Sequence, residues 1–81
     1  MTGVTVYSRA GCHLCAEAIE ALVALHGEGY RFELHEVDIE SEELLLRRLL
    51  EKIPVIEIDG EVVSELSLDA RALRARLDTV G

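Results

Sequence analysis

The sequence has 81 residues, of which 49% are hydrophobic, so it is long enough for one domain with a packed core and too apolar for a disordered chain. Its formal net charge of −8 disfavours a nucleic-acid partner, because an acidic domain repels phosphate backbones. No apolar run approaches the roughly 20 residues of a membrane-spanning helix, and the N-terminus lacks the pattern of a signal peptide. We therefore expect a single domain over residues 1–81, with no membrane partner and a cytoplasmic location.

The first half of the chain predicts a strand, a helix and a second strand. Residues 4–7 are an apolar run rich in β-branched side chains, which predicts a strand buried on both faces. Residues 12–25 contain neither glycine nor proline and predict a helix, which Gly27 and Gly29 end. Residues 30–37 alternate between apolar and polar side chains for most of their length, as an edge strand with one solvated face does.

The second half predicts a helix, a hairpin and a last helix. Residues 41–52 predict a helix that has Ser41 as its N-cap. Residues 55–63 predict a β-hairpin, because an Asp-Gly pair stands between two β-branched runs. Residues 66–77 predict the last helix. The expected apolar positions are Leu45, Leu46, Leu49, Leu50 and Ile53 for the first of these helices, and Leu66, Ala70, Leu73 and Leu77 for the second.

These elements follow one another in the order β-α-β-α-β-β-α. The first βαβ unit requires a right-handed parallel crossover, whereas the hairpin is antiparallel. The sequence therefore predicts an α/β fold in which a four-stranded mixed sheet carries helices on both faces.

The only two cysteines, Cys12 and Cys15, lie where the first predicted strand gives way to a helix. Redox dithiols, metal clamps and small structural disulfides all use Cys-x-x-Cys spacing, and a chain without an export pattern favours the first two. The positive end of a helix stabilises a thiolate, so the pKa of Cys12 is expected below the ordinary value of about 8.5. Cys15, one turn later on the same face, can attack a mixed disulfide on Cys12.

The basic side chains closest to the cysteines in the sequence can be interpreted in two ways, whereas the other histidines are expected at the surface. Arg9 can add positive charge near Cys12, or it can be a solvated loop residue. His13 can help electrostatically when protonated, or it can point into solvent. His26 and His35 are expected on the surface, the first at a helix C-terminus and the second on the polar face of an edge strand.

Pro54 is the only proline in the chain. It stands at the entry of the third predicted strand, one of the few places where a sheet accepts proline. From the residues alone, the bond before it can be an ordinary trans bond or the cis bond of a tight turn.

Three stretches together resemble glutaredoxins and small glutaredoxin-like proteins of the thioredoxin fold. They are VTVYSRAGCHLC at residues 4–15, HEVDI at residues 35–39 and IPVIEIDG at residues 53–60. The resemblance extends over roughly residues 3–78. It implies a thioredoxin-like fold of the glutaredoxin type and a thiol–disulfide oxidoreductase.

The resemblance also implies roles for single residues. Cys12 would be the exposed nucleophile and Cys15 the resolving thiol. Pro54 would follow a cis bond and face the cysteines, and Ile53 would offer its backbone to an extended thiol substrate. Arg9 matches a position where glutaredoxins often carry a lysine. The implied partners are a disulfide-containing protein or small thiol substrate and a thiol reductant system.

The sequence also departs from the glutaredoxin pattern. His13 and Leu14 stand between the cysteines, where glutaredoxins usually have Pro-Tyr. Residues 64–67 read Ser-Glu-Leu-Ser, where glutaredoxins usually have two glycines, a small polar residue and an aspartate that hold glutathione. Glu65 would repel a glutathione carboxylate there. We therefore predict no cofactor, although glutathione could still serve as a co-substrate.

Two other functions fit the same cysteines. Copper-trafficking domains also place Cys-x-x-Cys between a first strand and a first helix, and thiolates suit Cu(I) or zinc. That fold runs β-α-β-β-α-β, however, and a closed zinc site needs two further ligands, so no metal site is predicted. The chain could also be a thioredoxin-fold binding module in which the cysteines are dispensable.

Overall fold

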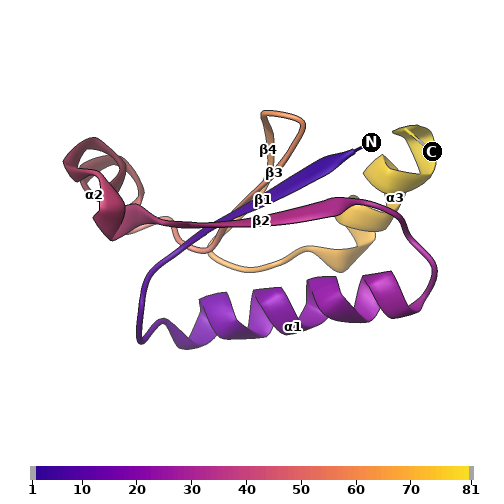
Figure 1. Cartoon of the computed structure of the whole chain (residues 1–81), viewed down its shortest axis with the longest axis horizontal. Helices are drawn as coiled ribbons and strands as arrows, with labels where there is room; N and C mark the ends of the chain where they lie inside the picture. Colours follow the sequence, from indigo (N-terminus) through magenta and orange to yellow (C-terminus); the bar gives the residue numbers. More distant parts are fainter. Residues whose placement is uncertain (1, 81) are drawn as a thin grey trace.

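Four strands form one mixed sheet in the order β2-β1-β3-β4 (Figure 1). A computed structural model describes residues 2–80 of the chain. The strands are β1 (Gly3–Ser8), β2 (Glu33–Asp38), β3 (Val55–Ile58) and β4 (Glu61–Glu65). Strand β1 is parallel to β2 and antiparallel to β3, which is antiparallel to β4. The predicted mixed sheet is confirmed, and so is the edge position of the second strand.

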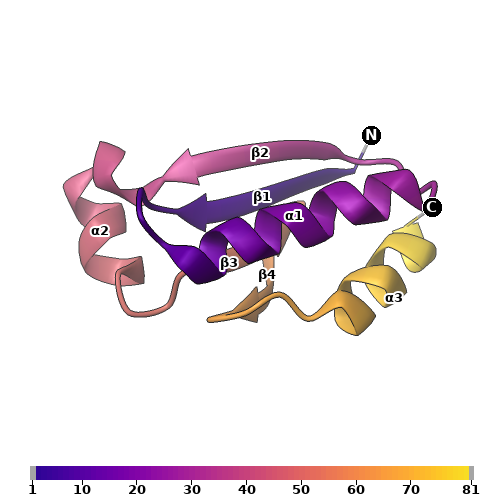
Figure 2. The ribbon, with the colours of Figure 1, turned by 90° about the horizontal axis from the view of Figure 1, so that it is seen from below.

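Three α-helices and one short 3-10 helix connect the strands. They are α1 (His13–Gly27), η1 (Ile39–Ser41), α2 (Glu43–Leu49) and α3 (Ala70–Val80). Helices α1 and α3 lie on the same side of the sheet, whereas α2 lies beyond the ends of β1 and β2 (Figures 1 and 2). Within residues 2–80, no helix is long and apolar enough to cross a membrane.

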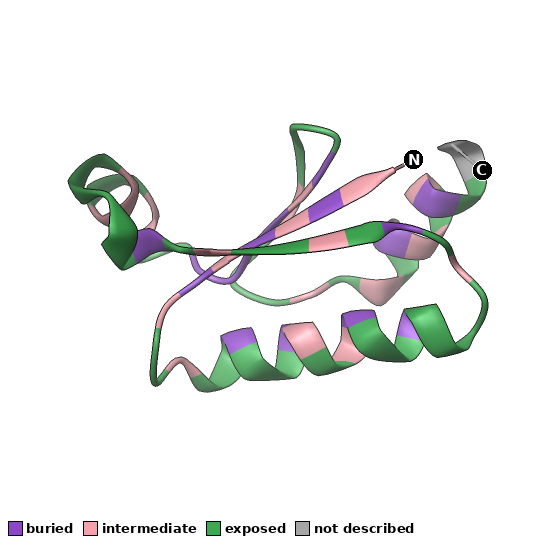
Figure 3. Cartoon of the chain, viewed as in Figure 1, coloured by how far each residue is buried: buried purple, intermediate pink, exposed green. Residues whose placement is uncertain are grey.

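The main core lies between the sheet and helices α1 and α3. Val4 and Val6 of β1 are fully buried there, and Figure 3 shows that the buried positions of α1 face the sheet. Thr5 and Tyr7 point to the opposite face of β1 and are only half-buried, so the prediction of a strand buried on both faces is wrong. The reason is that α2 is short and reaches this second face only near Tyr7, where its leucines pack.

The hairpin between β3 and β4 has the predicted two-residue turn. Asp59 and Gly60 have φ angles of 49° and 87°, the left-handed conformation at both positions that a type I′ turn requires. The side-chain oxygen Oδ1 of Asp59 also accepts a hydrogen bond of 2.9 Å from the backbone N–H of Gly3. This bond fastens the turn to the start of the central strand β1.

The predicted N-cap and one predicted apolar position of the second helix are wrong. Helix α2 begins at Glu43, and Ser41 instead donates its hydroxyl to the backbone carbonyl of Asp38 at 2.6 Å, within η1. Leu50 is predicted to be apolar and covered, but it lies just beyond the helix with 43% of its surface exposed.

The last helix starts later than predicted. It begins at Ala70, and the carboxylate of Asp69 accepts a hydrogen bond of 3.1 Å from the backbone N–H of Ala72, as an N-cap does. Leu66 has a φ angle of 68°, which a helix does not allow, and its side chain is exposed. Leu66 therefore belongs to the connection between β4 and α3, and only the later part of the predicted apolar series is helical.

Candidate active site

The two cysteines form a disulfide at the start of helix α1, with their Cα atoms 5.2 Å apart. A turn leads from β1 to this point, and in it the backbone N–H of Cys12 donates to the carbonyl of Arg9 at 3.3 Å. Gly11 has a φ angle of 78°, a conformation that glycine adopts without strain. The turn therefore places Cys12 at the N-cap of the helix and Cys15 within its first turn.

The two sulfur atoms lie in different environments. Only 2% of the surface of Cys15 is exposed, whereas Cys12 is half-buried and reaches the surface. The sulfur of Cys12 also accepts a hydrogen bond of 3.2 Å from the backbone N–H of Cys15. A thiolate at the same place would be stabilised by this N–H and by the positive end of the helix. Cys12 is thus the sulfur that an external thiol or disulfide can reach.

The loop before β3 packs directly behind the disulfide. Ile53 forms one buried cluster with Cys15 and Ile39, and Cys12 packs against this cluster. The peptide bond between Ile53 and Pro54 is cis, and Pro54 is fully buried. The structure therefore brings Ile53 to the cysteines, although 38 positions separate Cys15 from Ile53 in the sequence.

Arg9 and His13 are both paired with carboxylates. The guanidinium of Arg9 lies 3.4 Å from a carboxylate oxygen of Glu40. His13 projects into solvent, and its Nε2 atom lies 3.9 Å from the carboxylate of Glu17, one turn further along α1. Both residues lie close to Cys12 in the sequence, but their side chains are directed to Glu40 and Glu17.

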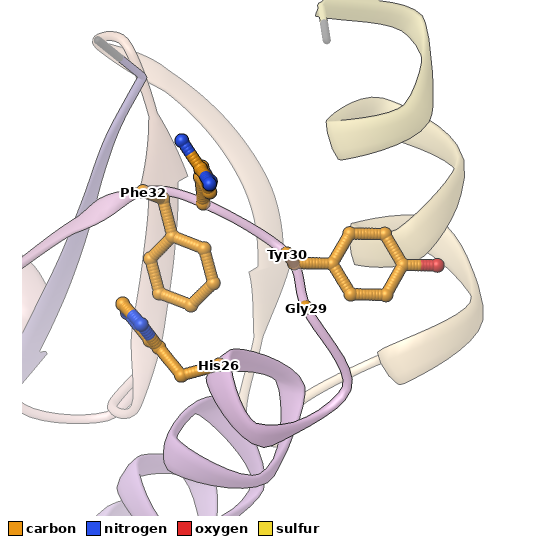
Figure 4. Close-up of a pocket in the computed structure, with 5 residues that line it drawn as sticks. His26, Gly29, Tyr30 and Phe32 are labelled. Atoms are coloured by element: carbon orange, nitrogen blue, oxygen red, sulfur yellow. The ribbon is translucent and has the colours of Figure 1, made fainter.

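His26 and His35 lie on the surface, as predicted. The ring of His26 packs on that of Phe32, with ring centroids 4.0 Å apart, while Tyr30 points away from both rings (Figure 4). These residues line a shallow pocket of about 350 Å³ at the end of α1 opposite to the cysteines. His35 pairs with Glu33 at 3.4 Å. In the part of the chain that the structure describes, no three His, Cys, Asp or Glu residues come together as metal ligands do.

Two further pockets were not expected from the sequence. One, of about 320 Å³, lies between α1 and the connection from β4 to α3, and its apolar lining includes Leu14, Ala18 and Leu68. The other, of about 450 Å³, lies at the end of α2 and includes Leu46. The sequence gives one signal for the first pocket, since the apolar Leu14 stands between the two cysteines. For the second pocket it gives none, because Leu50 and its neighbours look like an ordinary helix end.

Tyr7 lies behind the site and has a raised pKa. Its hydroxyl donates a hydrogen bond of 3.2 Å to Glu57 on β3. Burial contributes most to raising the pKa of Tyr7 above 10.0, followed by the charge and the hydrogen bond of Glu57, while the charge of Arg48 opposes the shift. The neutral phenol is therefore the form that the folded protein favours.

Replacing Glu57 with glutamine is expected to move the pKa of Tyr7 back toward 10.0, because the replacement removes a negative charge beside the phenol. Phenolate absorbance during an alkaline titration measures the effect, and a Tyr7→Phe variant identifies which of the two tyrosines gives the signal. Stability from this group is fully present below pH 10 and is lost as the pH rises through the raised pKa of Tyr7. An unchanged titration in Glu57→Gln would contradict the assigned contact.

Known families and structures resemble this chain. The family described as Glutaredoxin-like domain (DUF836) matches residues 3–78. The solution structure of protein Ne2328 from Nitrosomonas europaea is 31% identical, with a TM-score of 0.80 over 93% of this chain and 89% of that one. A protein structure from X. campestris is 32% identical, with a TM-score of 0.72 over 94% of this chain and 96% of that one. No curated protein matches the sequence.

A more distant structure matches the fold alone. The oxidised mitochondrial thioredoxin 3 of Saccharomyces cerevisiae is 13% identical, with a TM-score of 0.68 over 96% of this chain and 77% of that one. The thioredoxin-like α/β fold implied by the three sequence stretches is thereby confirmed.

Proposed function

Because the chain belongs to the family of glutaredoxin-like domains, we propose that it is a dithiol oxidoreductase that reduces protein or mixed disulfides through Cys12 and Cys15. The observation that carries this proposal is the asymmetry of the disulfide. Cys12 reaches the surface and accepts a hydrogen bond at the helix N-terminus, whereas Cys15 is almost completely buried behind it. This arrangement suits one attacking and one resolving thiol.

The reaction proceeds in two exchange steps. In the reduced protein, the thiolate of Cys12 attacks one sulfur of the substrate disulfide, forms a mixed disulfide and releases the other substrate sulfur as a thiolate. Cys15 then gives its proton to water and attacks the sulfur of Cys12. The bond between Cys12 and the substrate breaks, the second substrate thiolate leaves, and the Cys12–Cys15 disulfide forms. Two electrons thus pass to the substrate, and an external thiol reductant restores the dithiol.

The backbone of Ile53 can hold an extended substrate at one atom only. Its N–H already donates to the carbonyl of Leu49 at 3.1 Å, so this N–H is not available to a substrate. The carbonyl of Ile53 has no donor among residues 2–80, so it can accept a hydrogen bond from a substrate backbone N–H. We therefore assign substrate positioning to the backbone carbonyl of Ile53 and to the adjacent Pro54.

Protein disulfides are the favoured substrates over glutathione disulfide. Glu65 is the last residue of β4 and Leu66 follows it. A hydrogen bond of 2.9 Å from the N–H of Leu66 to the carbonyl of Lys52 ties this point to the loop before Pro54. Both side chains are exposed, so a carboxylate and an isobutyl group stand where a close approach to glutathione would be needed. A larger substrate can make contacts elsewhere on the surface.

The function is tested by mixing the reduced protein with a disulfide-linked peptide that carries no net charge. We expect one peptide disulfide to be reduced per chain, with mass spectrometry showing that the protein loses two hydrogen atoms. Adding glutathione with its reductase, or thioredoxin with its reductase, then identifies the donor that restores turnover. Exchange no faster than that of a free dithiol, together with one copper or zinc ion bound per chain, would instead support the metal-carrier hypothesis.

A further inference from the structure

Four of the eight basic side chains have no carboxylate within ion-pair distance in the part of the chain that the structure describes. Arg9, Arg47, Arg74 and Arg76 form ion pairs. The remaining four are Arg31, Arg48, Lys52 and Arg71. All four lie at exposed positions. The unpaired cations are therefore free to bind a carboxylate from another molecule.

Two of these unpaired cations line the same pocket. Arg48 and Lys52 border the pocket of about 450 Å³ at the end of α2, together with Leu46 and the exposed Leu50. The other charged residues of the lining are Arg47, which is paired with Glu43, and Glu51. Cations thus outnumber carboxylates in the lining. Basic residues near a helix C-terminus also suit the helix dipole.

The pocket shares one residue with the packing behind the disulfide. Leu46 lines it and also packs against the buried cluster that contains Cys15 and Ile53. Lys52 directly precedes Ile53, and Arg48 is close enough to Tyr7 for its charge to act on the phenol. Figure 2 shows that α2 lies at the same end of the sheet as the start of α1, where the disulfide is. A substrate segment in the pocket would therefore lie at the same end of the molecule as Cys12.

We propose that this pocket, which we call the α2 pocket, binds an acidic segment of a protein substrate that carries an apolar residue beside its carboxylates. The proposal rests on the proposed reductase function and specifies its substrate class. Carboxylates pair with the guanidinium of Arg48 and the ammonium of Lys52, and the apolar side chain contacts Leu46 and Leu50. A small anion without an apolar side chain would leave the two leucines uncovered.

The overall charge of the chain limits how this pocket can act. A protein with a net charge of −8 repels an acidic partner at long range. Salt at about 0.1 M screens such repulsion beyond about 10 Å, so attraction by the pocket acts mainly at contact. The preference should therefore appear in KM, and it should shrink as the salt concentration rises.

The test compares two disulfide-linked peptides that differ only beside the reacting cysteine, Leu-Glu-Glu-Cys in one and Leu-Lys-Lys-Cys in the other. The wild-type protein is expected to reduce the acidic peptide with the lower KM. The double variant Arg48→Glu/Lys52→Glu is expected to lower kcat/KM for the acidic peptide about tenfold and to reverse the preference. A Leu50→Ser variant should weaken binding of the acidic peptide but not of its analogue with serine in place of leucine.

The double variant Arg31→Glu/Arg71→Glu is the matched control. It changes the net charge of the protein by the same amount, and both of its sites are exposed, unpaired and outside the α2 pocket. We expect it to alter the peptide preference less than twofold. An equal loss in both double variants would mean that overall charge sets the preference, and it would overturn the proposal.

Two further results distinguish a failure of the proposed role of the α2 pocket from a failure of the reductase function. The wild-type protein could reduce glutathione disulfide with a lower KM than the acidic peptide, and Arg48→Glu/Lys52→Glu could remove this difference in KM. That result would mean that the α2 pocket binds glutathione, and it would overturn the proposal. If the wild-type protein reduces no uncharged disulfide at all, the reductase function itself fails. A preference that is absent in a wild-type protein with normal activity on the uncharged peptide overturns only the role of the α2 pocket.

Discussion

Replacing Cys12 with serine is expected to lower kcat/KM for disulfide reduction by about a thousandfold or more. Cys12 carries the sulfur that reaches the surface, and Cys15 is too deeply buried to take over the attack. A serine hydroxyl keeps the N-cap hydrogen bond to the backbone of residue 15, but it is not ionised at neutral pH and does not attack a disulfide. Peptide thiol release, followed with a chromogenic reagent, measures the loss.

Cys15→Ser is the matched partner of this variant and should behave differently. Its Cys12 still attacks the substrate, but no resolving thiol follows, so a mixed disulfide between protein and peptide accumulates. Mass spectrometry under non-reducing conditions should show this adduct in Cys15→Ser and no adduct in Cys12→Ser. An adduct on Cys15 in the Cys12→Ser variant would show that the assigned order of attack is wrong.

Replacing Leu22 with alanine is expected to lower the free energy of unfolding by about 2–5 kcal/mol. Leu22 is 0% exposed and packs from α1 into the cluster formed with Val4, Ile56 and Leu73. The change removes apolar contacts and leaves a cavity that the sheet and two helices cannot close without moving together. Urea unfolding of the oxidised protein measures the loss, as a lower midpoint at an unchanged slope.

The neighbouring Val23 gives a control on the same helix. It is 58% exposed, so Val23→Ala removes little buried surface, and alanine has a higher helix propensity than valine. We expect its free energy of unfolding to change by no more than about 0.5 kcal/mol. Equal losses in the two variants would mean that helix propensity, and not core packing, decides the stability of this region.

Most of the fold could be predicted because its local signals agree with the final packing. The β-branched run around Val6, the glycines after α1 and the Asp59–Gly60 turn all specify structure within a few residues. The start of α2 could not be predicted in the same way. The side chain of Asp38 accepts a hydrogen bond of 2.8 Å from the backbone of Glu40, and the resulting short turn takes Ser41 away from the helix.

The residues of the active site could be predicted from the sequence, but most of their contacts could not. The cysteine pair and Ile53–Pro54 could be placed because each belongs to a recognisable local pattern. The ion pair between Arg9 and Glu40 could not, because 31 positions separate the two residues and a surface pair leaves no pattern in the sequence. The α2 pocket was missed for a similar reason, since the absence of a partner for Arg48 becomes visible only when every carboxylate has been placed.

The two outer strands of the sheet affect how copies of this protein meet in concentrated solution. Strands β2 and β4 each pair on one side only within residues 2–80, and an unpaired strand edge can recruit another chain. Both strands begin with a glutamate and end with an acidic residue, Glu33 and Asp38 in β2 and Glu61 and Glu65 in β4. Glu61 is paired with Arg76, and the other acidic side chains disfavour the approach of a second edge that carries the same charges. The residues at the two edges therefore oppose the edge-to-edge association of copies that an open sheet otherwise permits.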